Sequence, residues 1–173
     1  MEKSDNRILT THVGSLPRVS ALRELLKERE KSSQEISSEL RDLIENAVSM
    51  AVDKQLESGI DIGNNGEQPR VGFSTYVTAR MEGFGGESPR PESLDLKEYP
   101  DYRKLLKNKR RTSSRINVTA TARAAIKYND LSEAADECDQ FLRLTAEKAK
   151  SFTEQFMTAA SPGIIATTMM NKH

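Results

Sequence analysis

Apolar side chains recur at helical spacing in two long stretches of the chain. The first stretch predicts an amphipathic helix over Gln34–Ser58, with Ser32 or Ser33 as its N-cap and Gly59 after its end. The second predicts a helix over Ser132–Ala159. The apolar side of the first helix is Ile36, Leu40, Leu43, Ile44, Ala47, Val48, Ala51, Val52 and Leu56, and that of the second is Ala135, Cys138, Phe141, Leu142, Thr145, Ala149, Phe152 and Phe156.

Short runs rich in β-branched residues lie between the helical stretches and predict strands. The glycine- and proline-rich residues 83–91 predict a long loop, and the basic run Lys107–Arg115 predicts a solvated loop. The candidate strands are Arg7–Val13, Ile60–Asn65, Ile116–Thr121 and Ile164–Met169, and further helical segments are expected at Val19–Lys31, Phe73–Met81 and Tyr102–Leu106.

The alternation of strands with helices favours an α/β fold with a parallel sheet. This pattern corresponds to about the first four β/α units of a (β/α)8 TIM barrel, that is, to a partial barrel. An open, doubly wound sheet uses the same βα unit, so the pattern leaves both architectures open. We expect a single incomplete barrel domain over residues 1–173.

Composition excludes several classes of function. The chain carries 26 Lys plus Arg and 26 Asp plus Glu, so its formal net charge is zero and no basic field is expected for nucleic acid or an anionic membrane. No run of about 18 apolar residues occurs, and the N-terminus lacks the apolar core of a signal peptide. We therefore expect a cytoplasmic protein. The 36% share of hydrophobic residues is lean for a self-sufficient domain.

Cysteine and histidine are scarce in this sequence. Cys138 has no second cysteine with which to form an internal disulfide, and His12 and His173 are the only histidines. Because Cys138 falls on the apolar side of a predicted helix, we expect it to be an inert buried thiol. The residues themselves therefore assign no metal ligand.

Two turns that follow predicted strands carry candidate binding residues. Gly14 and Ser15 follow the first strand, where glycine lets the backbone approach a ligand and serine supplies a hydroxyl, although an ordinary turn is the alternative. Glu67 follows the second strand, where its carboxylate can pair with a substrate ammonium group, with solvent or with Arg70. His12 either lines a pocket or is a structural residue.

Neighbouring residues suggest further hypotheses. Asp61, Asn64 and Asn65 can hold Glu67 in place or simply form the turn. The loop at residues 83–91 can act as a lid in which Arg90 meets an anionic group, or it can be a plain surface loop. The basic run contains no aromatic residue for base stacking, which disfavours nucleic-acid binding.

Three segments carry a resemblance to a known family. The first is Thr10–Arg18, TTHVGSLPR, and the second joins Gln55–Ile62, QLESGIDI, to Asn65–Arg70, NGEQPR. The third is Ser161–Ile165, SPGII. In this order and spacing they resemble the cobalamin-independent methionine synthases in their short, single-barrel form, which are related to the epoxyalkane:coenzyme M transferases. The resemblance covers the N-terminal half of the family's barrel.

The resemblance implies zinc-dependent methyl transfer from a methyl-folate to the thiol of homocysteine, a step of methionine biosynthesis, within a TIM barrel. By similarity, Gly14, Ser15 and Glu67 would bind the amino-acid part of homocysteine, with His12 and Arg70 beside them. The family's zinc ligands lie in the second half of its barrel. They are therefore expected outside this chain, and no catalytic residue is assigned to it.

We accordingly expect a methyltransferase fragment that is inactive alone. A C-terminal half-barrel chain, or self-association, would complete it. Two alternatives remain open: an alkyltransferase-like protein that acts on coenzyme M and an epoxide, and a non-catalytic, truncated binding or interaction protein.

Overall fold

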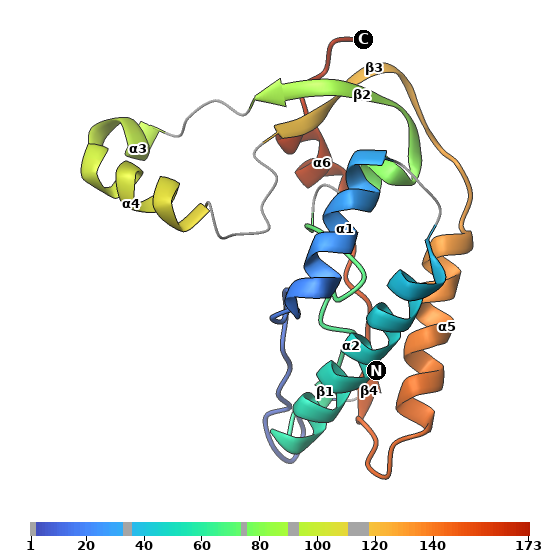
Figure 1. Cartoon of the computed structure of the whole chain (residues 1–173). Helices are drawn as coiled ribbons and strands as arrows, with labels where there is room; N and C mark the ends of the chain where they lie inside the picture. The colour runs from blue at the N-terminus through green and yellow to red at the C-terminus, as the bar shows by residue number, and fades with distance from the viewer. Residues whose placement is uncertain (1–2, 33–35, 74–75, 90–93, 111–117) are drawn as a thin grey trace. The chain divides into compact units, whose positions relative to one another are not determined.

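The computed structural model describes residues 3–32, 36–73, 76–89, 94–110 and 118–173. The chain divides into two compact units, whose elements are coloured by residue number in Figure 1. The first unit combines residues 1–73 with 130–159, and the second combines residues 74–129 with 160–173. The mixed α/β class predicted from the sequence is confirmed.

Short parallel segments form the sheet of the first unit. β1 (Ile62–Gly63) pairs in parallel with β4 (Glu154–Gln155). Thr11 forms a parallel bridge to Ile62 on the other edge of β1. The first two predicted strands are therefore aligned in parallel, but the pairing is confined to one or two residues each.

Three helices cover this sheet and supply the core of the first unit. They are α1 (Ser20–Ser32), α2 (Ser38–Glu57) and α5 (Ser132–Ala146). α2 packs against both α1 and α5, and Figure 1 shows α2 and α5 side by side. The predicted apolar side of α2 is the centre of the core, because its burial removes a continuous apolar surface from water. The buried cluster comprises Leu22, Leu26, Leu40, Ile44, Val48, Val52, Phe141, Leu144 and Phe152.

α2 begins later than its apolar pattern predicts. Ser37 is the N-cap, and its side chain accepts a hydrogen bond from the Leu40 amide at 3.2 Å. The proposed caps were therefore wrong: Ser32 is the last residue of α1, and Ser33 lies outside the described residues. The predicted stop is confirmed, since Gly59 follows α2 with a φ of 74°, a left-handed conformation that suits glycine.

α5 is much shorter than the predicted helix over Ser132–Ala159. The Thr153 amide donates to the Asp61 carbonyl at 2.8 Å, and the Phe156 amide donates to the Gly63 carbonyl at 3.0 Å. These long-range hydrogen bonds place the residues after α5 in extended pairing with β1. Pairing with a distant strand thus outweighs the helical spacing of the apolar residues.

Asp61 fastens the N-terminal segment to β1. Its carboxylate accepts hydrogen bonds from Arg7 Nη1 at 2.7 Å, the Thr10 amide at 2.8 Å and the Thr10 hydroxyl at 3.0 Å. The Arg7 guanidinium, followed by the Thr10 amide, holds the pKa of Asp61 well below its usual range. The hydrogen bonds of this carboxylate go to the N-terminal segment and not to Glu67, the residue that Asp61 was expected to support.

A two-stranded antiparallel sheet forms the frame of the second unit. β2 (Met81–Pro89) pairs with β3 (Val118–Tyr128). The prediction of a loop, and hence of a lid, was therefore wrong for residues 83–89, while Arg90 and residue 91 lie outside the described ranges. The register of the pairing shifts between Glu82 and Phe84 and between Gly85 and Ser88, and Gly83 and Gly86 have φ values of 90° and 61° at these shifts, a conformation that suits glycine.

The other predicted elements of this unit are displaced. A short 3-10 helix, η1 (Tyr76–Ala79), replaces the helix expected at Phe73–Met81, and residue 81 already belongs to β2. The third candidate strand corresponds to β3, but it is antiparallel and extends to residue 128, and residues 116–117 lie outside the description.

The predicted strand at Ile164–Met169 is a helix, α6 (Pro162–Thr168). The Ser161 side chain caps it by accepting from the Ile164 amide at 3.3 Å, and proline stands in its first turn. A serine cap followed by proline is a strong helix start, and here it overrides the β-branched composition of the segment.

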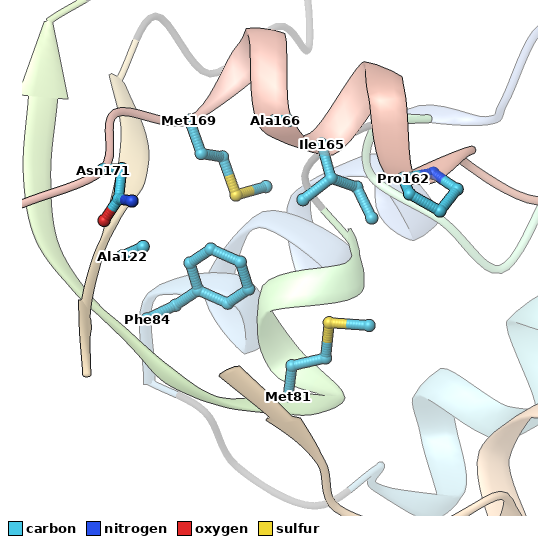
Figure 2. A pocket seen from close by; sticks show the side chains of 8 residues that line it. All are labelled: Met81, Phe84, Ala122, Pro162, Ile165, Ala166, Met169 and Asn171. Atoms are coloured by element: carbon cyan, nitrogen blue, oxygen red, sulfur yellow. The ribbon is translucent and has the colours of Figure 1, made fainter. Parts of the chain in front are cut away.

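An apolar cavity of about 320 Å³ lies between α6 and the β2–β3 sheet (Figure 2). Met81 and Phe84 of β2 line one side of it, and Ile165 and Met169 line the other. After α6 the chain runs along β3, since Ala122 exchanges backbone hydrogen bonds of 2.9 and 2.8 Å with residues 170 and 172.

Two further helices, α3 (Leu94–Glu98) and α4 (Pro100–Arg110), pack on each other in the second unit. The helical turn expected at residues 102–106 is part of α4. Residues 107–110 of the basic run also belong to α4, so the predicted loop was wrong there, and residues 111–115 lie outside the description. Across the described ranges, no helix combines the length and apolarity needed to cross a membrane.

Leucine-to-alanine substitutions should lower the free energy of unfolding at buried helix positions but not at exposed ones. Leu22 is 0% exposed at the centre of the first unit, whereas Leu142 on α5 is 56% exposed. We expect Leu22→Ala to lower the free energy of unfolding by roughly 3 kcal/mol, because it removes packed methyl groups and leaves a cavity. Leu142→Ala, the matched control, should change it by less than about 0.5 kcal/mol. Urea unfolding followed by circular dichroism measures both, and equal losses would contradict this description of the core.

The Asp61 carboxylate should make stability depend on acid pH. Because its folded pKa is lowered, its contribution to stability is complete above the unfolded pKa of about 4 and is lost as the pH falls below that value. We expect Asp61→Asn to be less stable than the wild type at pH near 7, with the difference shrinking towards acid pH. Urea midpoints measured across this range test the expectation, and a difference independent of pH would refute it.

Candidate functional site

A run of buried polar residues follows β1. Such residues are rarely buried unless their polar groups are satisfied, and clusters of them are uncommon in a small core. They therefore mark the part of the first unit whose sequence is least explained by packing. The buried polar residues of this loop are Asn64, Asn65, Glu67, Gln68 and Arg70.

Side chains of the loop hold its own backbone. Asn64 Oδ1 accepts from the Gly66 amide at 2.8 Å, and Asn65 Oδ1 accepts from the Glu67 amide at 3.0 Å. Gln55 of α2 anchors the start of the loop: its side-chain amide donates to the Asn64 carbonyl at 2.7 Å and accepts from the Asn64 amide at 3.2 Å. The two asparagines are thus turn formers that also fix where the next residues stand.

Glu67 has a left-handed backbone conformation. Its φ is 53°, next to Gly66 with a φ of 62°. This conformation is uncommon for a residue with a Cβ and is kept only where the surroundings enforce it, which occurs often at binding sites. Close packing explains the glycine, because a Cβ at position 66 would lie 3.0 Å from Leu16 Cδ1.

The turn after the first extended segment packs on this loop. The Leu16 amide donates to the Gly66 carbonyl at 3.0 Å, and Gln68 Nε2 donates to the Leu16 carbonyl at 3.2 Å. Arg18 donates to the carbonyls of Gln68, at 3.2 Å, and of Glu67. The two turns identified separately in the sequence therefore form one site.

The Glu67 carboxylate is the centre of the site and is 3% exposed. Oε2 accepts from the Ser15 hydroxyl at 2.7 Å, and Oε1 accepts from the Thr158 hydroxyl at 3.3 Å. Ser15 is exposed, so the carboxylate lies just beneath the surface. Each carboxylate oxygen is thus held by one hydroxyl group.

The charges around this carboxylate are only partly balanced. Burial lowers the pKa of Arg18, and the negative charge of Glu67 opposes this effect. The hydrogen bonds of Arg18 go to backbone carbonyls, however, and within the described residues no lysine or arginine forms an ion pair with the Glu67 carboxylate.

The remaining predicted site residues have other contacts. His12 Nε2 lies 2.9 Å from the Gly14 carbonyl and must donate there, because a carbonyl only accepts. Arg70 donates to the Thr158 carbonyl at 2.6 Å and pairs with Glu137 at 2.9 Å. Arg70 therefore reaches Glu67 through Thr158.

The sequence analysis missed Thr158, Glu137 and Arg18 as members of this site. Thr158 and Glu137 were assigned to one long helix, and no local pattern separates them from other helical positions. Arg18 stood in the first quoted motif, so a signal for it was present in the sequence.

The donor groups of the described residues do not fit a zinc site. No group of three His, Cys, Asp or Glu side chains comes together among them. His12 Nε2 already donates to the Gly14 carbonyl. Cys138 is exposed on α5, so the expectation of a buried thiol was wrong.

Comparisons with known proteins relate this chain to one family of enzymes. Residues 8–89 match the family model of the cobalamin-independent synthase catalytic domain. The fold is similar to that of a B12-independent methionine synthase from Shewanella sp. W3-18-1, solved in complex with selenomethionine, with a TM-score of 0.59 and 18% sequence identity. No curated protein sequence matches the chain.

The structural match covers 95% of this chain but only 41% of the synthase chain. Every site residue predicted from the sequence lies within the matched residues 8–89, whereas Thr158 lies outside them. The match to the catalytic-domain family and the shared fold confirm that the chain resembles the cobalamin-independent methionine synthases over part of their length.

Proposed function

We propose that the first unit binds the amino-acid end of homocysteine in a methionine-synthase-like methyl transfer. In this proposal the unit is the N-terminal part of a (β/α)8 barrel, and the ends of its parallel segments form the substrate-binding edge. Gly14, Ser15 and Glu67 contact the substrate, and His12 and Arg70 shape the surrounding loops.

The buried Glu67 carboxylate is the observation that carries the proposal. A carboxylate offers about four acceptor positions, and hydroxyl groups occupy two of them here. Burying a charge without a bonded cation costs free energy. An ammonium group supplies both the missing positive charge and the missing donors, so an α-amino acid is the chemical class that this site suits.

The same charge disfavours the coenzyme M alternative. Coenzyme M carries a thiol and a sulfonate but no ammonium group. Its sulfonate would approach the Glu67 carboxylate without compensation, and like charges in a poorly solvated site repel strongly. The alternative of a non-catalytic binding protein uses the same ammonium site and differs only in the chemistry performed at the thiol.

Thiol activation and the methyl donor belong, in this proposal, to residues outside the described ranges. Because the donor set here does not fit zinc, we assign the metal site and the methyl-folate site to a separate segment. A C-terminal half-barrel, or a second copy of the chain, would pair with the open edges of the sheet and bring that segment to Glu67.

Removal of the Glu67 charge should weaken amino-acid binding selectively. We expect Glu67→Gln to lower the affinity of the full chain for L-homocysteine and L-methionine by about tenfold or more, because the ammonium group loses the opposite charge and an NH2 donor replaces one acceptor oxygen. The affinity for γ-(methylsulfanyl)butyrate, which lacks the amino group, should be unchanged. Isothermal titration calorimetry measures these affinities.

The exposed Glu57 at the end of α2 offers a matched control, since Glu57→Gln makes the same chemical change away from the site. Equal wild-type affinities for L-methionine and its deamino analogue would refute the ammonium site. Tight binding of coenzyme M would favour the alkyltransferase alternative instead.

Metal content and solution mass should test whether the zinc site lies on a segment other than this chain's described residues. We expect the purified chain, supplemented with zinc and then desalted, to retain far less than one zinc ion per chain. Elemental analysis combined with light scattering measures both quantities. Stoichiometric zinc on a monomer would contradict the assignment of the metal site to another segment.

A further inference from the structure

Thr158 lies three residues after β4, where the third extended segment of the first unit reaches the Glu67 loop. Its hydroxyl is in contact with two side chains of opposite charge. Arg70 Nη1 lies 3.1 Å from Thr158 Oγ1, and Glu67 Oε1 lies 3.3 Å from the same oxygen.

The direction of these two hydrogen bonds is fixed by chemistry. A guanidinium only donates, so the Thr158 oxygen must accept from Arg70. An ionised carboxylate only accepts, so the single hydroxyl proton of Thr158 must point to Glu67. The Thr158 hydroxyl is therefore fixed in one orientation, because both of its neighbours require that orientation.

Arg70 is itself held firmly. It is 4% exposed, it donates to the Thr158 carbonyl at 2.6 Å, and its second terminal nitrogen lies 2.9 Å from Glu137 Oε2. The Glu137 side chain is 9% exposed, so this ion pair is buried. Its charges balance each other, and Arg70 acts on Glu67 through the hydroxyl of Thr158.

We propose that Thr158 is a positioning residue for ligand recognition: held by Arg70, its hydroxyl fixes the Glu67 carboxylate so that the open acceptor positions of Glu67 meet a substrate ammonium group. This inference rests on the proposed function. It also gives Arg70 a specific task, which is to orient Thr158 rather than to contact the substrate.

The preference of the chain for a ligand with an amino group distinguishes a positioning role of Thr158 from a role in stabilising the fold. Thr158→Val keeps the shape of the side chain and removes the hydroxyl. We expect it to lower the affinity of the full chain for L-methionine by about tenfold, as for the loss of a hydrogen bond to a charged group, and to leave the affinity for γ-(methylsulfanyl)butyrate unchanged. Thr158→Ser should restore the wild-type ratio of the two affinities.

Thr153→Val is the matched control. Residue 153 is an exposed threonine in the same segment, and the same substitution there should leave both affinities unchanged. Circular dichroism verifies folding of each variant, and Thr158→Ala replaces the valine variant if valine prevents folding.

Two results would overturn the inference: an unchanged ratio of affinities in Thr158→Val, whether or not both affinities fall equally, or no rescue by serine. Its failure can be distinguished from failure of the proposed function. If the wild type prefers L-methionine and Thr158→Val retains that preference, the positioning role alone is wrong. If the wild type shows no preference, the ammonium site itself is wrong.

Discussion

Parallel alignment of three extended segments is the constraint on which the candidate site depends. The segment around Thr11, β1 and β4 run in the same direction, so their carboxyl ends lie at one edge. Ser15, Glu67 and Thr158 each follow one of these segments. They are far apart in sequence, but hydrogen bonds join Ser15 and Thr158 to Glu67. Only a few backbone pairs define this alignment, and the Arg7–Asp61 contact and the helical core secure it.

Burial of polar side chains in the Glu67 loop costs solvation free energy. Local hydrogen bonds to most of these polar groups offset that cost. Gln55 and Asn64 bond to each other's polar groups, and the asparagine side chains bond to the loop backbone. These hydrogen bonds specify one loop conformation, including the left-handed Glu67. A loop held in this way has less conformational freedom to lose when a ligand binds.

The sequence predicts α1 and α2 of the first unit well, because the burial of their side chains follows a local period. α1 lies within a residue of its predicted bounds, and the apolar positions of α2 form the core as expected. Pairing of the first turn with the Glu67 loop also follows from the predicted parallel sheet. Ser15 and Glu67, which sequence position and family resemblance both singled out, are hydrogen-bonded to each other, and the role of Gly14, Ser15 and Glu67 in binding stays a prediction.

The elements that the sequence analysis missed depend on non-local interactions or on specific caps. β4 has only two residues, Glu154 and Gln155, with no apolar alternation, and only its pairing with β1 defines it. β2 contains glycines that favour turns in isolation but lie at register shifts in the pairing with β3. Thr158 could not be recognised because its role depends on Arg70 and Glu67, which lie about ninety residues earlier.

Charge balance links the fold to the chemistry of the ligand. Arg70 is compensated by Glu137, and Arg18 directs its donors to backbone carbonyls, so neither guanidinium bonds to the Glu67 carboxylate. A buried carboxylate that is held by two neutral hydroxyls and bonded to no cation keeps part of its accepting capacity. If the site existed only to stabilise the fold, an ion pair with Arg70 or a neutral glutamine would serve at lower cost. The unpaired charge is instead understandable where a cationic group of a ligand completes the site, and this is the physical reason for preferring an amino-acid thiol to an anionic one.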